Sequence, residues 1–177
     1  MKRFGTSYGG FYYPSTLPGL NKDSIIYCVG VGEDISHDIT IARQLDSHVY
    51  LFDPTPRAIQ HVKYIKDVFD NKTPVVHNKR FGGGDPNYMT LLTNNKVDSS
   101  KIHMFDYGLF IMDTTLKFYK PSNPEYVSHS VVKEIVDNTD YINVPVKKLT
   151  TIMKELNHTH VDLLKIDVEG CECEVLE

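Results

Sequence analysis

The sequence predicts an α/β fold with a mostly parallel sheet and helices on both faces. Short apolar runs of strand length alternate with stretches in which apolar residues recur at helical spacing. The first two helices follow their strands after turns of only a few residues. Such a β-α-β-α order gives parallel strands joined by right-handed crossovers. These two observations define the fold class before any single residue is considered.

The first strand is expected at residues 25–30, and the second at residues 48–53. The helix after the first strand is predicted from Ile35, Ile39, Ala42 and Leu45, with Asp34 or Ser36 as its N-cap. Pro56 opens the next helix, whose apolar stripe is Ile59, Val62, Ile65 and Phe69.

Residues 71–101 are rich in Asn, Gly, Pro and Asp and predict a long irregular loop of the kind that often covers a site. Strand patterns return at 102–110, 114–120 and 161–167. Between the last two of these, an amphipathic helix is predicted from Leu149, Ile152, Met153 and Leu156. No internal repeat and no domain boundary interrupts this order.

Composition limits the class of protein. A chain of 177 residues with 41% hydrophobic residues fits one globular domain. No apolar run approaches the ~18 residues of a membrane span, and the basic start leads into glycine and tyrosine rather than a signal peptide, so a cytoplasmic protein is expected. Three cysteines, two of them Cys171 and Cys173, predict neither a disulfide framework nor a zinc site. A formal net charge of −4 argues against a nucleic-acid partner.

The stretch "YCVGVGEDISHD" places Gly30 and Gly32 on a strand-to-helix turn at the carboxyl end of the sheet. Ligands of open parallel sheets bind at this end, where glycines let the backbone approach them closely. Asp53 ends the next strand, at the distance where an acidic residue accepts both hydroxyls of a ribose. The alternative is that Asp53 only caps the helix that begins at Pro56. The pattern favours a nucleoside-containing ligand.

Two features favour S-adenosylmethionine over NAD. Ile35 occupies the position of the third glycine in a dinucleotide-binding fingerprint. The carboxylates of Glu33 and Asp34 would repel a pyrophosphate, whereas they suit the sulfonium and ammonium of S-adenosylmethionine.

Taken together, several motifs in this order resemble the FkbM-type methyltransferases, a branch of the Rossmann-like class I methyltransferase fold. They are "FGTSYGG", "VGVGEDISHD", "VYLFDPTP", "YGLF", "TTLKFYKP", "VSHS", "VKKLTTIMKEL" and "DLLKIDVEGCECEVL", which are spread over nearly the whole length of the chain. The resemblance implies a single methyltransferase domain over residues 1–177, in which residues 1–23 close over the cofactor. The family sheet normally continues with further strands, so its C-terminal strands are expected to be absent from these 177 residues.

The resemblance also implies a set of cofactor-binding residues. Gly30 and Gly32 would line the methionine part of the donor, Asp53 would hold its ribose, and the loop at Asp106 and Tyr107 would meet its adenine. The full expected set is Tyr8, Gly9, Gly10, Gly30, Val31, Gly32, Glu33, Asp34, Ser36, Asp53, Pro54, Asp106, Tyr107 and Asp167. Two positions depart from the family pattern: Cys28 stands where an acidic residue is usual, and His37 where an aromatic one is.

Methyl transfer to a hydroxyl needs a group that takes the hydroxyl proton. The candidates are Asp167 and Glu169 on the turn after the last strand, and His129 in "VSHS", with His37 as a further histidine nearer the turn. Asp167 and Glu169 could equally cap the following helix. A divalent metal held by Asp106 and Asp167 could instead lower the pKa of the hydroxyl, although no ligand cluster requires one.

The predicted function is therefore S-adenosylmethionine-dependent O-methylation of a small-molecule or glycan acceptor. On family grounds, a hydroxyl of a deoxyhexose such as rhamnose or fucose is preferred. The alternatives are an oxidoreductase that binds NAD or a nucleotide sugar, and a non-catalytic S-adenosylmethionine-binding domain. The sequence does not determine the oligomeric state or the identity of the acceptor.

Overall fold

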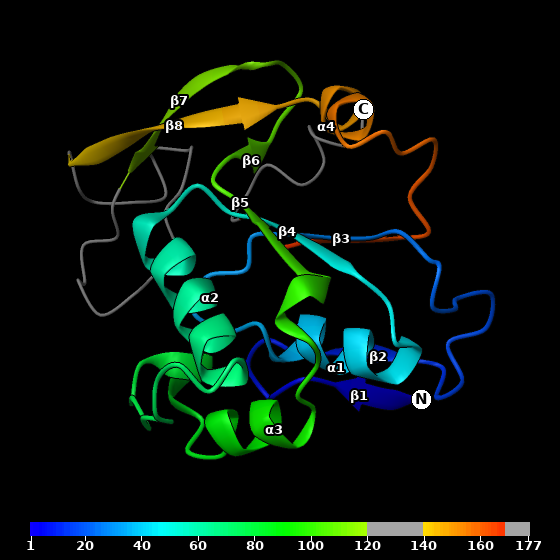
Figure 1. The fold of residues 1–177 in the computed structure, drawn as a ribbon. Helices are drawn as coiled ribbons and strands as arrows, with labels where there is room; N and C mark the ends of the chain where they lie inside the picture. The colour runs from blue at the N-terminus through cyan, green and yellow to red at the C-terminus, as the bar shows by residue number, and fades with distance from the viewer. Residues whose placement is uncertain (120–139, 169–177) are drawn as a thin grey trace.

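A central sheet of four parallel strands organises the computed structural model, which describes residues 1–119 and 140–168 (Figure 1). The strands lie in the order β5-β4-β3-β9. Their bounds are β3 Ile26–Val29, β4 Val49–Phe52, β5 Ile102–Phe105 and β9 Leu163–Ile166. The predicted α/β class with a mostly parallel sheet is confirmed.

The strands form where the sequence is apolar on both faces. All four residues of β3 are buried, as expected for a central strand of a parallel sheet covered on both sides. In the register of the sheet, Cys28 of β3 pairs with Leu51 of β4 and with Lys165 of β9. A lysine in this row is unusual, because the other residues of β9 are leucine or isoleucine.

Helices cover both faces of the sheet, as predicted (Figure 1). One face packs against three helices: α1 Ser36–Leu45, α2 Pro56–Phe69 and α3 Tyr88–Asn94. The other packs against α4 Leu149–Glu155, whose Ile152 is buried with Tyr27 and Phe52. Pro56 is the first residue of α2, where its fixed φ and missing N–H suit a helix start. No helix among the described residues is long and apolar enough to cross a membrane.

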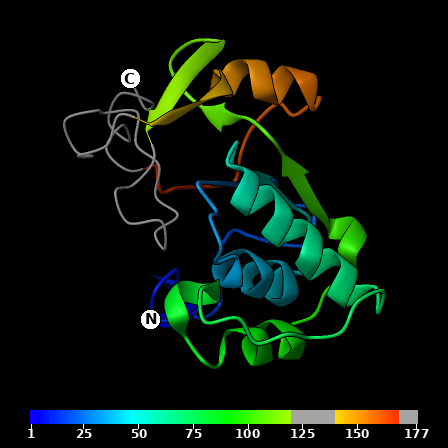
Figure 2. The same cartoon turned by 90° about the vertical axis from the view of Figure 1, so that its left-hand side faces the viewer.

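Two smaller sheets flank the central one. Strands β1 Lys2–Phe4 and β2 Phe11–Tyr13 form an antiparallel hairpin near α1. Strands β6 Gly108–Leu109, β7 Thr114–Tyr119 and β8 Tyr141–Lys147 form a mixed sheet in the order β6-β8-β7 on the same side of the central sheet as α4 (Figures 1 and 2). The sequence analysis missed β8, whose alternation is interrupted by Pro145.

Residues 71–101 are less irregular than predicted. They contain α3 and two short 3₁₀ helices, η1 Phe81–Gly84 and η2 Ser99–Lys101. Tyr88, Met89 and Leu92 are buried against the core, and this burial stabilises a helix that the polar composition of the segment concealed.

Candidate functional site

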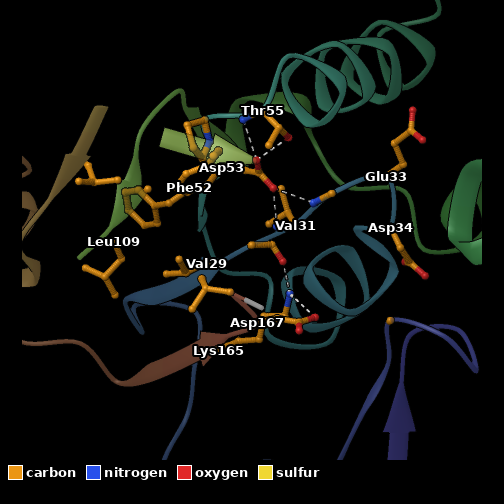
Figure 3. Close-up of a pocket in the computed structure, with 18 of the residues that line it drawn as sticks. Val29, Val31, Glu33, Asp34, Phe52, Asp53, Thr55, Leu109, Lys165 and Asp167 are labelled. Carbon is orange, nitrogen blue, oxygen red and sulfur yellow. Dashed lines mark hydrogen bonds and ion pairs between the residues drawn. The ribbon is translucent and has the colours of Figure 1, made fainter. Parts of the chain in front are cut away.

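The candidate site lies at the carboxyl ends of β3 and β9. The chain runs from β3 to β4 on one side, whereas β9 joins β3 from the other side, so the strand order reverses between β3 and β9. Such a reversal opens a crevice in which ligands of α/β proteins bind. A cavity of about 320 Å³ occupies this position and is lined by the glycine turn, the end of β4, the β6-β8-β7 sheet and the end of β9 (Figure 3).

Gly30 is required by the close approach of two strand ends. Its φ of 72° lies in the left-handed region, and a Cβ at this position would stand 1.8 Å from the backbone oxygen of Asp167. The N–H of Gly30 donates to the carbonyl of Phe52 at 3.0 Å. Gly32 also has a positive φ, 51°. The turn therefore lines the cavity with residues that carry little or no side chain, an arrangement typical of glycine turns that lie against a ligand.

Asp53 holds this turn in place. One carboxylate oxygen accepts the N–H groups of Val31 at 3.1 Å and Gly32 at 2.9 Å (Figure 3). The other accepts the N–H of Thr55 at 2.9 Å and its hydroxyl at 2.6 Å. A carboxylate offers about four acceptor positions, so a ribose hydroxyl would have to replace one of these bonds. The contact between Asp53 and a ribose thus remains a prediction. In addition, Asp53 has a structural role, because it fixes the backbone of the glycine turn.

The carboxylates of the two acidic residues in the turn, Glu33 and Asp34, both have partners within the protein. Glu33 is buried and forms ion pairs with Arg57 and Arg80. Burial alone would raise the pKa of Glu33, but the hydrogen bonds and charges of the two arginines outweigh it and hold the pKa below its ordinary value. Asp34 accepts hydrogen bonds from the Thr6 hydroxyl at 2.5 Å and from the Ser36 N–H at 2.8 Å. The turn is therefore less repulsive to phosphate than its sequence suggested.

The N-terminal segment reaches the cavity through Tyr8 and Gly9, two of the three residues expected there. A Cβ at Gly9 would meet the Asp34 carboxylate at 2.7 Å, so this segment lies directly on the turn. Gly10 does not line the cavity and packs against the backbone of the hairpin. Ser36 is also buried outside it, where its hydroxyl oxygen accepts the N–H of Thr6 at 2.8 Å.

Lys165 is a cavity residue that the sequence analysis missed. Its side chain is only 5% exposed, and its ammonium donates to the carbonyl of Gly30 at 2.7 Å. The same ammonium lies 3.8 Å from a carboxylate oxygen of Asp167. A charged residue inside the apolar run "LLKI" was the available signal, because a buried charge needs a partner.

Of the residues expected to take part in catalysis, only some lie within the part of the chain that the structure describes. Asp167 lines the cavity, with its side chain 57% exposed. Glu169 and His129 lie outside the described residues. His37 is 1% exposed and does not line the cavity; its nitrogens contact Asp38 and Tyr13 instead.

Asp106 and Tyr107 do not meet the cavity as expected. Asp106 lines a separate groove against α2, and Tyr107 is buried against Phe52 and Phe105. Gly108, Leu109 and Phe110, the next three residues, line the cavity instead. Because Asp106 and Asp167 border different depressions, the structure does not bring the two suggested metal ligands together.

The far wall of the cavity is apolar and comes from the β6-β8-β7 sheet. Leu109, Leu116, Phe118 and Val146 project from it toward the strand ends of the central sheet. The floor, in contrast, is formed by the glycine turn, Lys165 and Asp167. A cavity with one polar side and one apolar side suits a ligand with a charged part and a flat or hydrocarbon part.

Comparison with protein families agrees with this arrangement. The Methyltransferase FkbM domain matches residues 24–177, which include the glycine turn, Asp53 and all four strands of the central sheet. Searches of curated proteins and of solved structures gave no match. The fold, the glycine turn at the strand reversal and the length of the match lead to one conclusion: the chain belongs to the FkbM methyltransferase family.

Proposed function

We propose that this protein transfers a methyl group from S-adenosylmethionine to a hydroxyl of a small molecule or glycan. The observation that carries the proposal is the two-glycine turn at the strand reversal, with the cavity directly above it. The cavity fits the donor in chemical character, since its polar floor suits the amino-acid and ribose parts and its apolar wall suits the base.

When bound, S-adenosylmethionine would supply a methyl carbon already activated by the sulfonium. The protein must then align the acceptor and take up its proton. The backbone of Gly30 and Gly32 would hold the methionine part, and Gly108–Phe110 would pack on the adenine. Asp167 is the described carboxylate best placed to accept the proton, because it lines the cavity and is open to it. Glu169 and His129 remain further candidates for this role.

Lys165 contacts both the glycine turn and the proposed proton acceptor, Asp167. Its hydrogen bond to the Gly30 carbonyl fixes the turn, and its ammonium lies beside the carboxylate of Asp167. The ammonium and the carboxylate therefore place opposite charges side by side at the cavity.

For the acceptor, we propose a hydroxyl of a sugar, with a deoxyhexose such as rhamnose or fucose preferred. The support comes from the family resemblance and from the apolar wall. Side chains such as Phe118 and Leu116 can pack against the C–H face and methyl group of a deoxysugar. A cytoplasmic location and the absence of nucleic-acid and membrane partners remain predictions from composition.

Two alternative functions would use the same cavity. One is an oxidoreductase that binds NAD or a nucleotide sugar, and the other is binding of the methyl donor without catalysis. The pairing of Glu33 with Arg57 and Arg80 gives the first some weight, because it removes part of the repulsion toward phosphate. Ile35 still opposes it, since its buried side chain fills the place of the third glycine.

Calorimetric titration with S-adenosylmethionine, S-adenosylhomocysteine and NAD separates these functions. We expect heat of binding with the first two ligands and none with NAD. Binding of NAD alone would overturn the proposal in favour of an oxidoreductase.

Catalysis is then tested by mass spectrometry of a panel of sugars incubated with the protein and donor. We expect a mass gain of one methylene unit on at least one deoxyhexose. Asp167→Asn should lower turnover at least tenfold with donor affinity near wild type, whereas Asp23→Asn, at an exposed position, should change neither. Equal turnover in Asp167→Asn and wild type would remove Asp167 from the mechanism.

A further inference from the structure

A buried cluster of three potential metal ligands lies behind the glycine turn. Cys28 comes from β3, and His37 and Asp38 come from the first turn of α1. One ligand atom from each residue lies within 4.8 Å of the other two, and the three residues are 0%, 1% and 0% exposed. The cluster is separate from the cavity, which none of the three lines.

Hydrogen bonds within the cluster leave one acceptor unused. Nδ1 of His37 contacts one carboxylate oxygen of Asp38 at 3.0 Å, and Nε2 contacts the Tyr13 hydroxyl at 3.1 Å. The Cys28 thiol interacts with the Asp38 carboxylate as a weak donor, yet Oδ2 of Asp38 is fully buried and makes no hydrogen bond of normal geometry with the described residues. A buried carboxylate oxygen without a full hydrogen bond is costly, so Oδ2 is available as a ligand for a cation.

Lys165 supplies nearby positive charge to Asp38 but no hydrogen bond. It neighbours Cys28 across the β3–β9 pair, but its ammonium is directed to the Gly30 carbonyl, 2.7 Å away. Asp38 Oδ2 stays without a hydrogen bond although this lysine is near.

We propose that Cys28, His37 and Asp38 bind one zinc ion. Thiolate sulfur, imidazole nitrogen and carboxylate oxygen are the ligands zinc prefers, at about 2.3, 2.0 and 2.0 Å. Two such ligands on one tetrahedral ion lie about 3.3 Å apart, close to the 3.0 Å that already separates His37 Nδ1 from Asp38. The fourth position is left to water or a small anion. On binding, the ion replaces the thiol proton of Cys28, which passes to solvent.

Tyr13 completes the surroundings that such a site needs. A metal-bound histidine usually donates its other N–H to a fixed acceptor, which orients the ring, and Nε2 of His37 has the Tyr13 hydroxyl in this place. The rings of Phe11 and Tyr13 lie 5.2 and 5.6 Å from the His37 ring. The β1–β2 hairpin therefore covers the His37 side of the cluster.

Zinc binding at this site would also affect the part of the cavity wall that the β1–β2 hairpin forms. A hairpin of two three-residue strands is marginal by itself, and the turn of this hairpin carries Tyr8 and Gly9, which line the cavity. A zinc ion behind His37 would fix the hairpin and with it this part of the cavity wall.

The test uses the full chain, stripped with a chelator and then given Zn²⁺ or the spectroscopic probe Co²⁺, with no methyl donor present. We expect one zinc per chain after desalting, and a cobalt spectrum with a thiolate-to-metal absorption band. Cys28→Ser should remove this band, and Asp38→Asn should weaken zinc binding at least tenfold. Asp46→Asn, which changes an exposed carboxylate, should leave both unchanged.

His37→Phe keeps an aromatic ring between Phe11 and Tyr13 and should therefore fold even if Cys28→Ser does not. It is expected to abolish zinc binding. Hydrogen exchange of residues 2–13 should slow when zinc is added to the wild type and should not respond in His37→Phe. The proposal is overturned if the wild type retains no zinc, or if the folded His37→Phe protein binds zinc as the wild type does. Neither result bears on methyl transfer, which is measured separately.

Discussion

The carboxylate of Asp53 accepts the backbone N–H of Gly32 at 2.9 Å and so connects the end of β4 to the glycine turn that follows β3. Asp53 was expected to bind the ribose of a ligand. In the structure its carboxylate accepts hydrogen bonds from the backbone of the turn. The two roles are compatible, because an ordered turn is what allows backbone groups to meet a ligand in a fixed geometry.

Asp53→Asn should therefore lower both stability and donor affinity. An amide has one acceptor oxygen in place of two and presents its NH₂ to backbone donors, so the turn loses charge-assisted bonds. We expect a loss of about 2–3 kcal/mol in the free energy of unfolding, measured by urea denaturation. If stability falls by less than about 0.5 kcal/mol, the hydrogen bonds of Asp53 do not hold the turn.

Gly30→Ala and Gly19→Ala form a matched pair, because both glycines have positive φ, 72° and 86°. A Cβ at Gly30 collides with the backbone of Asp167, whereas a Cβ at Gly19 has nothing within 4 Å. Gly19→Ala should cost only conformational strain, about 1 kcal/mol. Gly30→Ala should cost more than about 3 kcal/mol and abolish donor binding.

Thermal unfolding and calorimetric titration measure this pair. Similar melting temperatures for the two variants would show that the contact between the ends of β3 and β9 is not constrained as described.

Glu33→Gln should lower the free energy of unfolding by about 1–3 kcal/mol, because it removes a buried charge that pairs with both Arg57 and Arg80. The folded-state pKa of Glu33 lies below its unfolded value, so its contribution is present at neutral pH and is lost as the pH falls through the acid range. The control is Glu155→Gln, whose partly exposed ion pair with Lys147 should contribute at most about 1 kcal/mol. Equal effects of the two substitutions would argue against a special role for Glu33.

His61 should make stability depend on pH in the mildly acidic range. Desolvation lowers its pKa from 6.5 to about 4, and the buried ring contacts the Tyr88 hydroxyl through Nε2 at 2.7 Å. The unfolded chain binds the proton first, so the free energy of unfolding falls between about pH 6.5 and pH 4, by about 3 kcal/mol from this group.

This dependence is measured as the difference between the wild type and His61→Gln across that pH range. His77→Gln, at an exposed position, is the control and should follow the wild type. A wild-type curve parallel to that of His61→Gln would show that His61 does not titrate as described.

Local patterns explain how much of the fold was predictable. Helix α2 was predicted because Pro56 marks its first residue and its apolar residues recur at helical spacing. Helix α3 and strand β8 were missed, since polar residues in one and Pro145 in the other weaken the local pattern. Both are stabilised by contacts with segments distant in the sequence, such as β7 for β8, and a local pattern cannot show these.

The site follows the same division. The position of Gly30, Gly32 and Asp53 at the ends of their strands could be predicted from spacing alone, because a short strand-turn-helix unit fixes where its turn lies. Asp106 and Tyr107 precede the residues that line the cavity, Gly108–Phe110, because the direction of the chain after β5 depends on the pairing of β6 with β8.

The sequence by itself determined the α/β class, the position of the glycine turn and the family resemblance, because these depend on periodicity and on residues close together in the chain. Only the tertiary structure decided that Glu33 is neutralised by Arg57 and Arg80, and that Lys165 joins Gly30 to the end of β9. It also brought Cys28 beside His37 and Asp38. These groups come from separate elements, and the distances between their charges are set only when the sheet and helices pack together.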